Sequence, residues 1–165
     1  MIIFYIVYTI VIIQRLGELF IARKNEQWLK KRGGIEVGER HYPLFIIIHA
    51  CFFLSFMIEV HTTEQYFIQS LFVFFLLLQI GRIWCIISLG RFWNTKVIVV
   101  PNVIRIKRGP YKWCKHPNYT IVLLEILTLP LMFGAIKTAL IFVSFQLILI
   151  FIRIPCEERA LRGEF

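Results

Sequence analysis

The sequence contains no aspartate, and its ten acidic residues are all glutamate. It also lacks three motifs of soluble enzymes, since no G-x-G-x-x-G, no G-K-[ST] and no G-x-S-x-G occurs. The first two bind dinucleotides and nucleotide phosphates, and the third presents a nucleophilic serine. Their absence removes the sequence basis for these three functions.

Cysteine is scarce, and the four cysteines show no C-x-x-C spacing. Two of them, Cys51 and Cys85, lie in apolar segments, which is not the pattern of a disulfide framework. Cys114, His116 and Cys156 could converge on a metal, but a zinc site needs three or four ligands in tetrahedral array. We therefore predict no metal site.

Long apolar runs are abundant: 58% of the 165 residues are hydrophobic and 16 are phenylalanine. Such runs are typical of membrane-spanning helices. We predict an all-α integral membrane protein with about five transmembrane helices, folded as a single domain over residues 1–165. The apolar runs without Asp, Glu, Lys or Arg include 1–14, 41–58, 65–81, 83–90, 126–136 and 138–152.

The first and the last apolar runs lead to further predictions. The first run opens at Met1 with no basic residues before it and no small-residue cleavage site, which favours a retained helix over a cleaved signal peptide. The fourth and fifth helices are expected to be shorter, with roughly 15 residues each, or about 22 Å of helix. They are predicted to form a C-terminal helical hairpin that turns at Gly134.

Basic residues orient the predicted bundle. Seven Lys or Arg lie in 15–40 and seven in 91–115, whereas 59–65 has none. The positive-inside rule then predicts a cytoplasmic C-terminus and an outside N-terminus, in a membrane that we expect to be the bacterial cell membrane. Because the +9 charge lies in loops beside the membrane, lipid headgroups are the expected partner and nucleic acid is not.

Residues 91–119 are predicted to form a cap and carry a net positive charge. Segments 97–100 and 103–106 read as two extended pieces around Pro101 and Asn102, and predict a cytoplasmic cap over the mouth of the helix bundle. The region has seven basic residues and no acidic one, so it attracts an anionic substrate or cofactor.

Several polar residues interrupt the apolar runs. Glu18 and Asn25 lie near one face of the first helix, where Glu18 either pairs with Arg15 or, together with Asn25, forms a wall of a substrate-binding cleft. Glu125 is expected to be a buried partner of Arg82 or another basic group. His49 is expected to hydrogen-bond to a neighbouring helix.

Two polar clusters adjoin the last apolar runs. Residues 109–119 read G-P-Y-K-W-C-K-H-P-N-Y, and residues 153–158 read R-I-P-C-E-E. Aromatic rings and a histidine beside carboxylates suit a flat, cationic, partly polar ligand. At the membrane edge, such a site is reached from both water and lipid.

These clusters resemble the isoprenylcysteine carboxyl methyltransferase family, with its patterns G-x-Y-x-x-x-[RK]-H-P-x-Y and R-x-x-x-E-E. The resemblance implies an S-adenosylmethionine-dependent O-methyltransferase whose cofactor region spans about 91–165. Its acceptor would be lipophilic, such as an isoprenylcysteine-type carboxylate or an alkylpyrone enol. Carried over position by position, the resemblance assigns cofactor contacts to Val103, Ile104, Arg105, Ile106, Tyr111, His116, Pro117, Asn118, Tyr119 and Glu157.

The resemblance also assigns Arg153 to the substrate carboxylate, as the catalytic residue. Simpler roles stay open: Arg153 and Glu157 could form an ordinary i,i+4 pair, and His116 and Tyr119 could cap a helix or anchor it among headgroups. Two other functions also stay open. These are an NADPH-dependent membrane reductase and a non-catalytic membrane protein that binds lipid or a partner. The sequence does not predict an oligomeric state.

Overall fold

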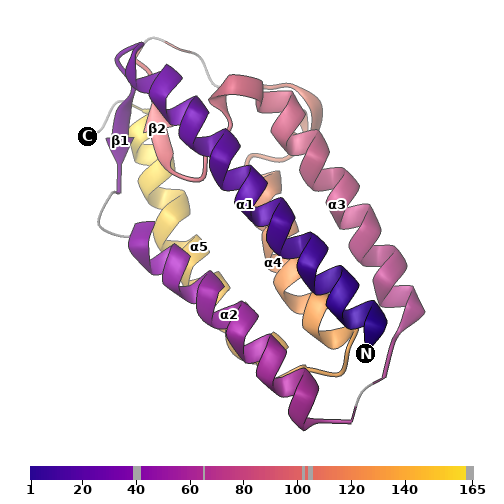
Figure 1. Ribbon diagram of the computed structural model, residues 1–165. Helices are drawn as coiled ribbons and strands as arrows, with labels where there is room; N and C mark the ends of the chain where they lie inside the picture. Colours follow the sequence, from indigo (N-terminus) through magenta and orange to yellow (C-terminus); the bar gives the residue numbers. More distant parts are fainter. Residues whose placement is uncertain (39–41, 65, 102, 104–105, 163–165) are drawn as a thin grey trace.

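A computed structural model describes residues 1–38, 42–64, 66–101, 103 and 106–162. Its helices run lengthwise beside one another in a bundle (Figure 1). They are α1 (Ile2–Lys30), α2 (Tyr42–Thr62), α3 (Gln69–Leu89), α4 (Pro117–Leu131) and α5 (Ile136–Leu161). The N-terminus lies at one end of the bundle, and two short strands and the end of α5 lie at the other, which we call the sheet end (Figure 1).

Four of these helices are long and apolar enough to cross a membrane: α1, α2, the stretch Gln69–Phe92 that includes α3, and α5. Many of their large apolar side chains face outward, as Ile80, Ile87 and Phe151 do. Such a surface suits lipid rather than water. The predicted all-α membrane fold is therefore confirmed.

Helix α4 is the short inner helix of the bundle. Its 15 residues correspond to about 22 Å, less than the roughly 30 Å of a hydrocarbon core. It packs chiefly against α3 and α5. The α4–α5 hairpin is also confirmed, with Gly134 at φ 84° in its turn. A Cβ at Gly134 would lie 2.9 Å from the Tyr66 ring, so the turn requires glycine.

The prediction for α5 was wrong in length, because this helix has 26 residues rather than roughly 15. The apolar run stops at Arg153, but a charged residue does not end a helix. Helix α5 continues through Pro155 to Leu161 and carries the whole 153–158 cluster. Proline costs one backbone hydrogen bond here without ending the helix.

Strands β1 (Ile35–Val37) and β2 (Val97–Val99) form a small antiparallel sheet, with Glu36 opposite Ile98. The sheet contacts α5. The predicted extended piece at 97–100 therefore has its partner far upstream, and two of the four residues of the second predicted piece, 103–106, lie outside the described residues.

A ring of four alternating charges fastens this sheet to the end of α1. Lys30 lies 2.6 Å from Glu26 and 2.8 Å from Glu36, and Lys96 lies 2.9 Å from each of these carboxylates. Burial alone would lower the pKa of Lys96, but the two carboxylates outweigh it and raise this pKa above its ordinary value. Lys96 is therefore charged at neutral pH and holds β2 against α1.

A second charged cluster lies inside the bundle and joins α1, α3 and α4. Arg82 contacts Glu18 at 2.5 Å and Glu125 at 2.8 Å, and all three residues are buried. Arg15 contacts the same two carboxylates, at 3.0 and 2.8 Å. The predicted pairing of Glu125 with Arg82 is confirmed. His49 differs from expectation, because its ring hydrogen-bonds to the Phe45 carbonyl of its own helix at 2.8 Å.

Candidate functional site

The two polar clusters of the sequence meet at the sheet end, where α4 begins and α5 ends (Figure 1). His116 immediately precedes α4, and Glu157 lies near the end of α5. Because α4 and α5 form an antiparallel hairpin, residues about forty positions apart become neighbours.

A chain of hydrogen bonds connects the clusters. The Arg153 Nε donates to the Tyr119 hydroxyl at 2.8 Å, and this hydroxyl donates to the Glu157 Oε2 at 2.6 Å. Arg153 also donates to the Thr95 carbonyl, and its guanidinium lies 4.8 Å from the centre of the Phe45 ring. Arg153 and Glu157 are thus linked through a tyrosine, which differs from a simple ion pair on one helix.

His116 packs against this chain. Its ring stacks on Tyr119, with centroids 5.5 Å apart and an interplanar angle of 23°. Its Nε2 lies 3.4 Å from the Glu158 Oε1, and its Nδ1 lies 3.7 Å from the Glu157 Oε2. Although His116 occupies the N-cap of α4, its side chain makes no capping hydrogen bond, so helix capping does not account for it.

Asn118 contributes an unused acceptor. Its Oδ1 is buried and has no hydrogen-bond partner among the described residues. An unsatisfied buried acceptor costs about 1–3 kcal/mol, so such groups call for a specific explanation. A donor group of a ligand would satisfy it. The neighbouring Pro117 is buried at the first position of α4, where proline suits a helix start.

Tyr111 is placed by the short helix η3 (Gly109–Lys112), which packs on α3. Gly109 has φ 54°, and a Cβ there would lie 2.0 Å from the Ser88 Oγ. The Tyr111 hydroxyl interacts electrostatically with the Cys85 thiol. Burial raises the pKa of Tyr111 above its ordinary value, and the negative charge of Glu157 raises it further, so this hydroxyl stays protonated at neutral pH.

The other predicted site residues that the structure describes are not brought into this cluster. Val103 is exposed and Ile106 is partly buried, whereas Ile104 and Arg105 lie outside the described residues. Glu18 pairs with Arg82 inside the bundle. Asn25 donates to the Trp93 and Gly90 carbonyls, at 2.6 and 3.2 Å, and so ties α1 to the segment after α3. A role of these residues in ligand binding stays a prediction.

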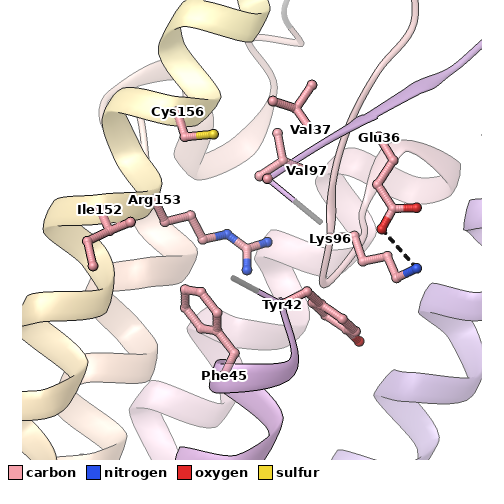
Figure 2. Close-up of a pocket in the computed structure, with 10 residues that line it drawn as sticks. Glu36, Val37, Tyr42, Phe45, Lys96, Val97, Ile152, Arg153 and Cys156 are labelled. Atoms are coloured by element: carbon pink, nitrogen blue, oxygen red, sulfur yellow. Dashed lines mark ion pairs between the residues drawn. The ribbon is translucent and has the colours of Figure 1, made fainter. Parts of the chain in front are cut away.

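Two cavities adjoin the hydrogen-bonded chain. A narrow one of about 20 Å³ lies between α2, α5 and the sheet, and the Arg153 side chain points into it (Figure 2). Phe45, Tyr42, Lys96 and Cys156 are among its walls. The sequence did not predict these wall residues, because an aromatic residue at the start of a helix belongs to no spaced motif.

The second cavity is larger, about 290 Å³, and lies along α4 and α5. Cys114, Lys115, His116 and Tyr119 make it polar at the sheet end. Along the two helices it is aliphatic, lined by Leu123, Leu147, Ile150 and Ile154. This gradient suits a ligand with a polar head and an apolar chain.

Comparison with known proteins places the cluster in a family. Residues 71–163 match the model of the isoprenylcysteine carboxyl methyltransferase (ICMT) family. The chain is 45% identical to the "Uncharacterized protein YpbQ" of Bacillus subtilis (strain 168) over 162 residues, which cover 96% of each chain. It is 27% identical to an "Uncharacterized protein" of Haemophilus influenzae (strain ATCC 51907 / DSM 11121 / KW20 / Rd) over 155 residues, or 92% of this chain and 90% of that one. No solved structure matches the chain. The match covers more than half of the sequence and contains both polar clusters, so the protein belongs to the isoprenylcysteine carboxyl methyltransferase family.

Proposed function

We propose that the protein is an S-adenosylmethionine-dependent O-methyltransferase that methylates an ionised oxygen of a lipophilic acceptor at the membrane surface. The observation that carries this proposal is the chain Arg153–Tyr119–Glu157. It holds a cation suited to an anionic acceptor beside a carboxylate suited to a cationic cofactor, at the polar end of a membrane bundle.

The residues of the site fit the cofactor. The Glu157 side chain is 27% exposed and accepts one hydrogen bond from the Tyr119 hydroxyl, which leaves carboxylate lone pairs free for an ammonium group. Asn118 offers its unpaired Oδ1 to a further donor. His116 or Arg105 would bind the cofactor carboxylate, and Tyr111 or Tyr119 would stack on its adenine. When bound, S-adenosylmethionine supplies an activated methyl group.

The acceptor side requires little proton chemistry. A carboxylate is already ionised at pH 7, so no strong general base is needed. Arg153 would bind the anionic oxygen, and its three protein contacts fix the direction in which it does so. The rate enhancement would then come from alignment of the reacting groups and exclusion of water.

The acceptor must offer an ionised oxygen and must be lipophilic, and these two requirements define its class. An isoprenylcysteine-type carboxylate and an alkylpyrone enol each combine an acidic oxygen with a long apolar chain. The aliphatic part of the larger cavity would bind such a chain. We further propose that the sheet end faces the cytoplasm of a bacterial cell, because basic segments border it.

Calorimetric titration of the detergent-purified chain with S-adenosylmethionine and S-adenosylhomocysteine tests the proposal. We expect micromolar binding that falls at least about tenfold in Glu157→Gln, because the charged partner of the ammonium is lost. The matched control is Glu64→Gln, an exposed glutamate in the connection between α2 and α3, which should bind as the parent does. Binding of NADPH instead would indicate a reductase, and binding of neither would indicate a non-catalytic protein.

A transfer assay then separates the two acceptor types. The chain is incubated with methyl-labelled S-adenosylmethionine and a bacterial lipid extract, and the labelled lipid is treated with mild alkali. A methyl ester of a carboxylate releases labelled methanol, whereas a methyl ether of an enol keeps its label. The absence of labelled lipid in both fractions would count against the proposed activity.

A further inference from the structure

Tyr119 stands between the two cavities of the site. Arg153 lines the narrow cavity between α2 and α5, and Tyr119 lines the larger one along α4 and α5. The Tyr119 hydroxyl accepts from Arg153 and donates to Glu157, at 2.8 and 2.6 Å. A positive and a negative group are therefore connected through one polarised hydroxyl.

This connection affects how strongly Arg153 attracts an anion. The negative charge of Glu157 offsets part of the positive potential that Arg153 presents to the narrow cavity, because the Tyr119 hydroxyl holds both charged groups within hydrogen-bond distance of one oxygen. A cation that pairs with Glu157 removes this offset. The positive potential of Arg153 in the narrow cavity then increases, so Arg153 attracts an anion more strongly.

We infer that Tyr119 is a positioning residue that couples the two ligands, so that a cation at Glu157 tightens the binding of an anion at Arg153, and the reverse. The inference rests on the proposed function, in which these are the cofactor ammonium and the ionised acceptor. Linkage requires that the effect be equal in both directions. Methylation removes the negative charge of the acceptor, so the coupling is lost once the product forms and the neutral product leaves more readily.

The coupling is measured by calorimetric titration of the micelle-solubilised chain with S-adenosylhomocysteine, which has the ammonium group but no methyl group to transfer. Hexadecanoate serves as the anionic probe, and hexadecan-1-ol is the neutral probe of equal chain length. We expect hexadecanoate to tighten S-adenosylhomocysteine binding about fivefold or more, a typical coupling between sites, and hexadecan-1-ol to leave it unchanged.

Tyr119→Phe removes the hydroxyl and keeps the ring that stacks on His116. In this variant S-adenosylhomocysteine should still bind, and the tightening by hexadecanoate should fall below about twofold. Tightening that persists in the variant would overturn the inference and leave the proposed function standing. Failure of the parent chain to bind S-adenosylhomocysteine would overturn both.

A second variant keeps the inference testable if Tyr119→Phe does not fold. Glu157→Gln preserves an acceptor for the Tyr119 hydroxyl but removes the charge that offsets Arg153. Equilibrium binding of labelled hexadecanoate, without cofactor, should therefore become severalfold tighter than in the parent chain. Structural damage would weaken binding, so unchanged or weaker binding would contradict the coupling.

Discussion

At the scale of single residues, Gly109 shows how one backbone position sets the site. Its φ of 54° and the 2.0 Å approach of a Cβ to the Ser88 Oγ leave no room for a side chain. We expect Gly109→Ala to lower stability by about 1–3 kcal/mol, through strain and overpacking. Thermal unfolding in detergent measures this, with Gly17→Ala as control, because a Cβ at Gly17 meets nothing within 4 Å. Equal melting temperatures of the two variants would contradict this account.

Some contacts of the site can be predicted from sequence motifs, and others cannot. His116, Tyr119, Arg153 and Glu157 belong to spaced motifs, and the structure brings all four together. The Thr95 carbonyl that orients Arg153 is a main-chain acceptor, which any residue could supply. Such contacts depend on where a connecting segment is placed in space, so no sequence pattern could have predicted them.

At the scale of elements, composition predicted the helices well and their ends poorly. The apolar runs identify all five helices, because lipid demands apolar surfaces on each. The end of α5 was missed because polar residues at the membrane edge are compatible with continued helix. The pairing of β1 with β2 was missed because each has only three residues, too few to show a period.

The interior charges that join α1, α3 and α4 lead to a prediction about elements. Arg82→Gln leaves Glu18 and Glu125 buried with Arg15 as their remaining cationic partner in the cluster. We expect a loss of about 3–5 kcal/mol, the usual cost of breaking a buried pair from one side. Unfolding in detergent measures it.

Two further variants separate charge from general perturbation in this cluster. Arg23→Gln, at an exposed position of α1, should melt as the parent does. The double variant Arg82→Gln with Glu18→Gln should recover part of the loss, because it removes a buried negative charge together with its cation. A double variant less stable than Arg82→Gln alone would mean that the cluster does not act through charge balance.

At the scale of the whole molecule, the site, both strands and the end of α5 lie at the sheet end, while the α2–α3 and α4–α5 connections lie at the other end (Figure 1). The basic residues of 23–32 and the described basic residues of 91–115 border the sheet end, so we expect it to be cytoplasmic. Cys114, exposed beside the site, reports on one end, and Glu64→Cys reports on the other. With the remaining cysteines replaced by serine, a membrane-impermeant maleimide added to intact bacteria should label Glu64→Cys and should reach Cys114 only after permeabilisation. Labelling of Cys114 in intact cells would place the site outside, where intracellular S-adenosylmethionine cannot reach it, and would contradict the proposed function as well as the orientation.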